Sequence, residues 1–310
     1  SLICTFLFDN KFVGRISGFY ISYAVVGFLF FIFLLYRPKS FKRSFCKYAL
    51  AISCPLIIHN LAGNIMHLFD RVMIERLDSS YNAGLYGVAY SCAMIANILR
   101  NSMNAAWEPW VYGKIASNNQ DDIKKSSYIF LIVFSLLCVG LMLIAPELLY
   151  IVGGQVYSIS KYVIPPVVLA YMFSMIYNLY SGIEQYYKKQ VYFAIVASIC
   201  AVLNIILNYI FIQKWGYLSA AYTTVFCMAF ECLLHYLNVR KMGYSNLYNG
   251  KFIFVIILFW VVFSGFSLVL YNYTILRYTV LVIYFTVICF FVIRYKNIFI
   301  NCFNSFLNKK

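Results

Sequence analysis

Charged residues are scarce in this chain of 310 residues, at 11%, whereas hydrophobic residues make up 63%. A soluble domain carries about 25% charged residues. A soluble core of this length could not bury so much apolar surface, and a membrane is the solvent that suits this composition. The scarcity of charge therefore argues against a soluble globular domain.

The sequence also lacks the motifs of enzymes and metal sites. Its ten cysteines form no CxxC pair, and most lie in apolar runs, where a free cysteine acts as a small hydrophobe. None of the three histidines, His59, His67 and His235, has a second ligand at a zinc-like spacing. There is no glycine-rich phosphate loop and no GxSxG motif. We therefore expect no catalytic residue, no metal, no cofactor and no disulfide framework.

Basic residues are not gathered on one face, so the net charge of +15 does not predict nucleic-acid binding. They fall in short clusters between apolar runs, seventeen in one set of alternate loops and seven in the other, with Arg100 left over. Because cytoplasmic loops of membrane proteins carry the excess of Lys and Arg, the richer side should be cytoplasmic. The C-terminal tail belongs to that side.

Nine apolar segments are long enough to cross a membrane, since a spanning helix needs about 20 mostly apolar residues. They are 14–36, 46–69, 84–107, 127–149, 161–181, 190–212, 217–239, 251–271 and 276–294. Proline is expected to interrupt the segments that contain Pro55, Pro146 and Pro165–Pro166. The predicted fold class is an all-α polytopic membrane protein. Because the chain starts at Ser1, we expect a fragment of a longer protein.

Polar stripes on two of these segments are the best functional signal. Residues three and four apart share a helix face, and polar residues in a span usually face the bundle interior or a cavity. The first stripe includes Asn60, Asn64 and His67, and the second Asn97, Arg100, Asn101, Asn104 and Glu108. We expect the second stripe to line a wet cavity. For Asn204 and Asn208, hydrogen bonding between helices is the better explanation.

Four titratable residues are candidates for ion or proton coupling: Glu231, His59, His67 and Asp70. Glu231 is the only carboxylate that we place deep in a span. We expect it at the depth of Arg100, where the two could form an ion pair that lowers the cost of both charges. The two histidines could relay protons, but simple packing is the interpretation that we favour for them.

Residues 70–112 contain several short motifs in a characteristic order: Asp70-Arg71, Gly84-Leu85-Tyr86, Ala89-Tyr90 and Asn104-Ala105-Ala106-Trp107, followed by Pro109. Together with "GRISGFYISY" before them and "WGYLSAAYTTV" after them, they resemble the polysaccharide-flippase branch of the multidrug/oligosaccharidyl-lipid/polysaccharide exporter superfamily. Proteins of that family have two helical lobes that face each other across a central cavity.

The resemblance implies an organisation in three parts. Residues 1–45 would be the end of the first lobe, with its last helix at 14–36. Residues 46–240 would be the second, six-helix lobe, and residues 241–310 two additional C-terminal helices with a cytoplasmic tail. The rest of the first lobe would then be missing at the N-terminus.

The resemblance also implies transport without chemistry. Proteins of this kind flip undecaprenyl-diphosphate-linked oligosaccharide repeat units across the bacterial cytoplasmic (inner) membrane for O-antigen or capsule biosynthesis. Expected partners are the lipid-linked oligosaccharide, membrane lipids, and the polysaccharide polymerase with its chain-length machinery. Two alternatives stay open. A drug/cation antiporter of the same superfamily should have deep carboxylates, and a membrane polysaccharide polymerase should have a sizeable outer loop.

Arg100 is the residue that we expect to hold the diphosphate of such a substrate. A charge in mid-span costs about 3 kcal/mol on insertion scales, and arginine does not avoid this cost by losing its proton. Its planar fork suits phosphate oxygens, and Asn97, Asn101 and Asn104 offer hydrogen bonds to sugars. The alternative is a structural arginine whose head group reaches the inner lipid headgroups.

The distribution of basic residues predicts the sidedness of three cysteines. Cys46 and Cys302 should lie at the cytoplasmic side and Cys4 near the outer surface. Single-cysteine variants treated with a membrane-impermeant thiol reagent in intact cells measure this directly. Ready labelling of Cys302 without permeabilisation would mean that the orientation is reversed.

Overall fold

The computed structural model describes residues 10–36 and 43–294. All regular secondary structure in these ranges is helical. The α-helices are α2 (Lys11–Leu35), α3 (Arg43–Leu77), α4 (Ser80–Ala116), α5 (Gln120–Gly153), α6 (Ile164–Tyr186), α7 (Gln190–Trp215), α8 (Leu218–Lys241), α9 (Gly250–Leu270) and α10 (Thr274–Arg294). Two 3₁₀ helices lie between them: η1 (Gln155–Val163) connects α5 to α6, and η2 (Ser245–Leu247) connects α8 to α9.

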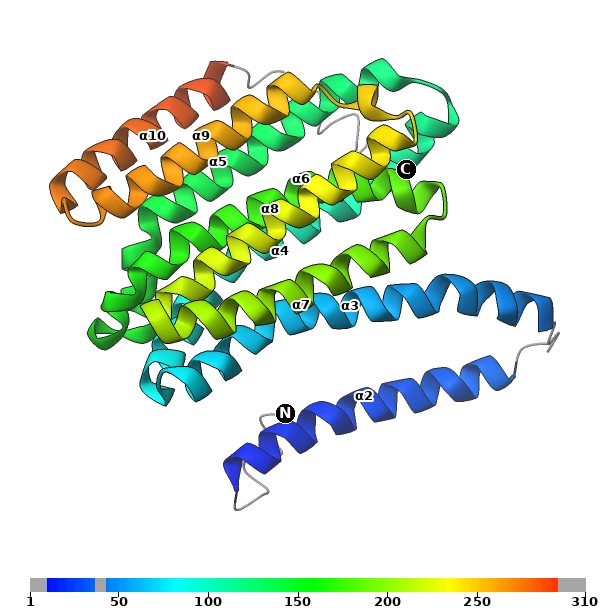
Figure 1. Cartoon of the computed structure of the whole chain (residues 1–310), viewed down its shortest axis with the longest axis horizontal. Helices are drawn as coiled ribbons and strands as arrows, with labels where there is room; N and C mark the ends of the chain where they lie inside the picture. The colour runs from blue at the N-terminus through cyan, green and yellow to red at the C-terminus, as the bar shows by residue number, and fades with distance from the viewer. Residues whose placement is uncertain (1–9, 37–42, 295–310) are drawn as a thin grey trace. The chain divides into compact units, whose positions relative to one another are not determined.

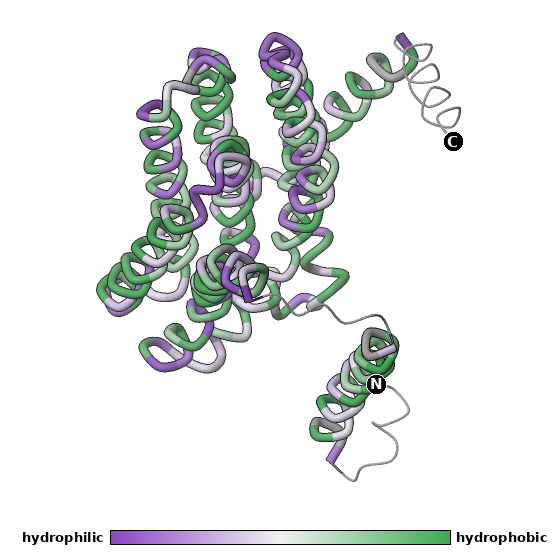
Figure 2. The backbone as a smooth tube through the Cα atoms, turned by 90° about the vertical axis from the view of Figure 1, so that its right-hand side faces the viewer, coloured by the Kyte–Doolittle hydropathy of each residue, from purple (hydrophilic) through white to green (hydrophobic). Residues whose placement is uncertain are grey.

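Each of the nine predicted segments coincides with one of these helices, which confirms an all-α polytopic membrane fold. In the described ranges, seven helices are long and apolar enough to cross a membrane by length and composition. Helix α4 is not among them, because Arg100 and its neighbouring asparagines lower its hydropathy, and α10 has a shorter apolar stretch, Thr274–Phe290. Along the helices hydrophobic residues predominate, with many hydrophilic residues at the ends (Figure 2).

The chain divides into two compact units, residues 1–51 and 52–310. In its described part the first unit contains α2 and the start of α3. Helix α2 exposes large apolar side chains, among them Phe19, Phe28 and Phe30. Such a surface is stable in lipid or against other protein. The predicted division into 1–45, 46–240 and 241–310 stays a prediction.

Helix α6 lies at the core of the second unit, packed against α4, α5, α8 and α9 (Figure 1). Apart from Phe173, every residue from Ile164 to Glu184 is buried. A helix with neighbours on all sides must be apolar on every face, and α6 largely meets this requirement. Its larger polar exceptions, Asn178 and Glu184, therefore need partners inside the protein.

One of the predicted proline interruptions is wrong. Pro165 and Pro166 occupy the first turn of α6, where backbone N–H groups have no acceptor within the helix, and η1 precedes them. They begin a helix rather than break one. Pro55 and Pro146 do lie inside helices, in α3 and α5 respectively.

Polar contacts attach the turn between α9 and α10 to α5. The Arg277 guanidinium donates to the Leu143 carbonyl at 2.8 Å and also contacts the Glu147 carboxylate. The Tyr271 hydroxyl donates to the Met142 carbonyl at 2.7 Å. These bonds fix the C-terminal helix pair against the second unit.

Part of the predicted topology concerns residues that the structure does not describe. Cys4, Cys302 and the C-terminal tail lie outside the described residues. Cys46 lies in the first turn of α3 and is partly exposed.

Candidate functional site

Arg100, midway along α4, is hydrogen-bonded to neutral groups. Its Nη2 donates to Oδ1 of Asn97 and Oδ1 of Asn101, both at 2.8 Å, and its Nε donates to Asn97 at 3.2 Å. Its Nη1 donates at 2.6 Å to Oγ of Ser174, which is buried on α6. Contacts from two helices thus fix the direction of the guanidinium fork. Sequence reasoning missed Ser174, because nothing local distinguishes a serine that faces a neighbouring helix.

The predicted ion pair between Arg100 and Glu231 is not formed. No carboxylate oxygen of the described residues lies within 4.0 Å of the Arg100 guanidinium. Glu231 is buried on α8, and α6 packs extensively against both α4 and α8. Similar depth on two helices does not bring their side chains together when the helices, like α4 and α8, do not pack closely against each other.

Asn104 and Glu108 continue the polar stripe of α4. Asn104 Nδ2 donates to Glu108 Oε1 at 2.8 Å, whereas Asn104 Oδ1 is buried and has no hydrogen-bond partner. An unpaired buried amide oxygen costs free energy, and a donor from a ligand or from water would recover it. The stripe therefore offers both a cation and a vacant acceptor.

The first stripe is less organised. Asn60 and Asn64 are exposed on α3, and their side chains make no hydrogen bond to other described residues. His59 stacks on Phe193 of α7 with ring centroids 3.7 Å apart, which agrees with a packing role. Its Nδ1 is nevertheless buried and unpaired. The side chain of His67 lies outside the described residues.

The carboxylate of Asp70 connects α3 to three other helices. It accepts hydrogen bonds from the Tyr86 hydroxyl at 3.0 Å, Asn208 Nδ2 at 2.6 Å and the Thr224 hydroxyl at 3.0 Å. Asn208 Nδ2 also contacts Asn204 Oδ1 at 3.2 Å, so the predicted bonding of these asparagines between helices is confirmed for Asn208.

All these donors to Asp70 are neutral, and the carboxylate is fully buried without an ion-pair partner among the described residues. The described residues contain no group of three or more His, Cys, Asp or Glu side chains that could hold a metal ion. Asp70 Oδ1 and Asn204 Oδ1 both accept from Asn208 Nδ2, and Asp70 Oδ2 accepts from Tyr86 and Thr224, so these oxygens all have donors within the protein.

Tyrosines connect Asp70 to the surroundings of Arg100. The rings of Tyr86 and Tyr90 are 5.6 Å apart, and the Tyr171 hydroxyl donates to that of Tyr90 at 3.3 Å. Tyr171 lies on α6 three residues before Ser174, the hydrogen-bond partner of Arg100. Asp70 and Arg100 therefore lie at the two ends of one row of polar side chains, although they do not touch.

A second buried carboxylate, Glu184, was not predicted. Its Oε2 is 2.7 Å from Nδ1 of His235, and its Oε1 accepts from Nδ2 of Asn238 at 2.8 Å. The side chains of Glu184 and His235 are both fully buried. The expectation that Glu231 is the only carboxylate deep in a span stays a prediction, because Glu184 is buried but lies two residues before the end of α6. The predicted span ends at residue 181, whereas α6 continues to Tyr186 and buries Glu184.

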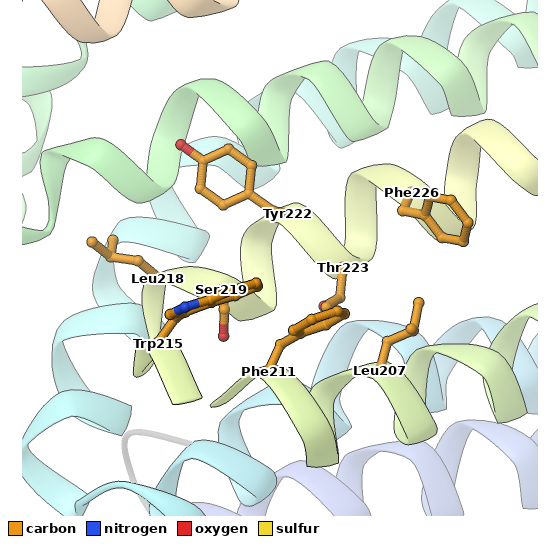
Figure 3. A pocket seen from close by; sticks show the side chains of 8 residues that line it. All are labelled: Leu207, Phe211, Trp215, Leu218, Ser219, Tyr222, Thr223 and Phe226. Carbon is orange, nitrogen blue, oxygen red and sulfur yellow. The ribbon is translucent and has the colours of Figure 1, made fainter. Parts of the chain in front are cut away.

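An apolar groove of about 540 Å³ lies between α7 and α8 (Figure 3). Its lining contains Leu207, Phe211, Trp215, Leu218, Ser219, Tyr222, Thr223 and Phe226. None of these residues is charged, so the groove does not suit a hydrated sugar. Thr223 connects the groove to Asp70, because the Thr223 hydroxyl contacts Asn208, which in turn donates to Asp70.

A model of the MatE family matches residues 55–210, which is just over half of the chain. The chain belongs to the MatE family. The matched region of this MatE protein runs from α3 into α7 and contains both Arg100 and Asp70. It is a multi-pass membrane protein of a transporter family, and the predicted membership of the exporter superfamily is confirmed at this level.

Among solved structures, the chain is similar to "Lipid II flippase MurJ, inward closed conformation" with a TM-score of 0.61. The identity is 17%, so the likeness shows the fold alone. The match covers 96% of this chain and 65% of the MurJ chain, and the MatE protein described here spans less than two thirds of that structure. No curated protein matches the chain.

The contacts of Glu184 predict a structural role for this residue. In a Glu184→Ala variant, buried His235 and partly buried Asn238 both lose this partner, which should destabilise the protein by about 3 kcal/mol. Glu184→Gln keeps an acceptor oxygen and should cost less. Detergent-solubilised protein unfolded by heat and by SDS titration gives both values. Glu75→Ala, at an exposed position of α3, is the control. Equal stability of Glu184→Ala and Glu75→Ala would contradict the assignment.

Proposed function

We propose that this MatE protein flips lipid-linked oligosaccharides across the bacterial cytoplasmic membrane. The substrate would be an undecaprenyl-diphosphate-linked repeat unit for O-antigen or capsule biosynthesis. The observation that carries the proposal is Arg100, a guanidinium in mid-span that is held by neutral groups and paired with no acid among the described residues.

The partners of Arg100 orient it without neutralising it. Asn97, Asn101 and Ser174 accept hydrogen bonds and contribute no negative charge. The positive charge stays available to an anion, and the fork geometry of arginine matches two phosphate oxygens. A diphosphate that enters the site would offset a desolvation cost of about 3 kcal/mol that the empty site bears.

The polar groups around Arg100 support a sugar substrate. Asn101 is exposed, and the unpaired Asn104 Oδ1 can accept from a hydroxyl. Asn60 and Asn64 are exposed on α3 and would extend the hydrated path. The contact with Ser174 points the guanidinium toward α6 rather than toward lipid headgroups, which favours substrate binding over the snorkelling alternative.

Asp70 is the best-supported candidate for ion coupling. A single buried carboxylate with neutral donors gains stability when a proton or a monovalent cation neutralises it. Glu231, His59 and His67 are weaker candidates. His59 stacks on Phe193, and Glu231 shares no hydrogen bond with the partners of Arg100 or Asp70 among the described residues.

The buried carboxylates also favour a second candidate function, a drug/cation antiporter of the same superfamily. Asp70, Glu184 and Glu231 are all buried, so the structure contains more buried carboxylates than the sequence analysis predicts. Glu184 is already committed to His235 and Asn238, however, and Arg100 would repel a cationic drug. A flippase accounts for both Arg100, which would bind the anionic substrate, and Asp70, which would bind the coupling ion. The polymerase alternative lacks support, because the described loops are short.

Arg100→Ala should reduce surface-polysaccharide display about tenfold or more, since the loss of a charge-assisted contact costs about 1.5–3 kcal/mol. Arg100→Lys keeps the charge without the fork and should retain part of the activity. The measurement is display on cells that contain equal membrane amounts of the complete protein. Ser102→Ala, at an exposed position of the same helix, is the control and should be neutral. Wild-type display by a normally abundant Arg100→Ala protein would leave snorkelling as the explanation.

Asp70→Asn preserves the shape of the side chain and removes its charge. We expect the variant to lose the response of transport to an imposed ion gradient. Purified protein in liposomes, tested with a proton gradient and separately with a sodium gradient, identifies the ion. Asp121→Asn, at an exposed position near the start of α5, should respond like the wild type. A gradient response that survives in Asp70→Asn would exclude this residue from coupling.

A further inference from the structure

A cationic cavity of about 500 Å³ lies at one end of the second unit. Its walls come from the start of α5, the end of α8, and the segment from η2 into α9, whose ends lie close together (Figure 1). Three basic residues line it, Lys124, Arg240 and Lys251, and no acidic residue does. None of the three side chains has an ion-pair partner in the described part of the chain. The cavity is therefore electrostatically prepared for an anion.

An apolar groove of about 410 Å³ continues from this cavity. It runs between α6, α8 and α9, and its lining includes Leu233, Phe254 and Ile257. Tyr180, Tyr236 and Gly250 line both the cavity and the groove, so the two are contiguous. From Gly250 to Ile257, at about 1.5 Å per residue, the groove extends about 10 Å along α9, away from the helix end.

Two tyrosines form the boundary between the polar and apolar parts. The rings of Tyr180 and Tyr236 meet edge to face, with centroids 5.5 Å apart, and Tyr180 also contacts Tyr248. Tyr180 is 4% exposed, and neither its hydroxyl nor that of Tyr236 has a hydrogen-bond partner among the described residues. Two unpaired hydroxyls at the rim of a cationic cavity suit the oxygens of a phosphoester.

We propose that this cavity and groove together bind one anionic phospholipid of the surrounding leaflet. The phosphate would lie among Lys124, Arg240 and Lys251, and an acyl chain would occupy the groove between α6, α8 and α9. Basic pockets between spanning helices at the membrane surface are suited to anionic lipid headgroups. The site is separate from Arg100, and it does not require the proposed substrate.

The polarity of the two compartments excludes simpler occupants. A free phosphate or other small anion would leave the apolar groove unfilled, and an uncharged lipid would leave three cations unpaired. An anionic lipid satisfies both compartments with one molecule. Because it would contact α5, α6, α8 and α9 at once, it would also hold the C-terminal helix pair against the second unit.

The test is native mass spectrometry of the delipidated full chain, titrated with phosphatidylglycerol and with phosphatidylethanolamine. We expect wild-type protein to bind phosphatidylglycerol preferentially. The triple variant Lys124→Gln/Arg240→Gln/Lys251→Gln should bind it about tenfold more weakly or worse, since each basic residue near an anionic lipid surface contributes about 1 kcal/mol. A matched triple variant, Lys125→Gln/Lys189→Gln/Lys241→Gln, removes exposed charges outside the cavity and should bind like the wild type.

Two further measurements test the apolar groove by itself and distinguish a membrane phospholipid from the lipid part of the proposed substrate. Ala229→Trp fills the groove and should weaken binding of long-chain phosphatidylglycerol more than binding of a short-chain form. Undecaprenyl phosphate is titrated in parallel. If it binds through the three basic residues and phosphatidylglycerol does not, the site belongs to the substrate and the proposal is wrong. Equal loss in both triple variants would show non-specific charge attraction and would also overturn it.

Discussion

Lipid offers no hydrogen bonds, and this constraint decides where the buried polar side chains of the second unit lie. Asp70 satisfies its carboxylate with donors from α4, α7 and α8, and Glu184 on α6 does so with His235 and Asn238 on α8. Arg100 on α4 reaches Ser174 on α6. Each of these contacts joins helices that apolar packing alone would allow to slide, since van der Waals contacts between spanning helices specify register weakly.

The same constraint distinguishes buried charges that have a charged partner inside the protein from those that do not. Glu184 is paired with His235 at 2.7 Å and accepts from Asn238, so both of its carboxylate oxygens have partners on α8. Arg100 and Asp70 are hydrogen-bonded but not neutralised. A protein retains an uncompensated charge in a membrane at a cost, and binding of an oppositely charged species recovers that cost. The two groups have opposite signs, which suits a transporter that binds an anionic substrate and a coupling cation.

The outer surface of the bundle follows different physics. The groove between α7 and α8 is apolar throughout, whereas the groove beside α9 opens into a cavity with three cations. The α7–α8 groove offers a lipid only the dispersion contacts that it already has with other lipids. The three cations beside the α9 groove add an electrostatic attraction, which favours binding of anionic lipids there. The difference in charge between the two grooves arises at the helix ends. Arg240 and Lys251 line the same cavity because α8 ends and α9 begins at the same end of the bundle.

The sequence by itself determined the membrane environment and the nine helical segments, and it singled out Arg100 as a charge in mid-span. These depend on local quantities, namely the length of apolar runs and the cost of one charge in a span. Only the tertiary structure decided which side chains contact Arg100, Asp70 and Glu184. Ser174 beside Arg100, Tyr86 and Thr224 around Asp70, and the pairing of Glu184 with His235 all join residues distant in the chain. The expected pair of Arg100 and Glu231 failed for the same reason. Depth along a helix follows from residue number, but the face that a residue presents to another helix depends on how the helices pack. Here α4 and α8 each pack against α6 and not closely against each other.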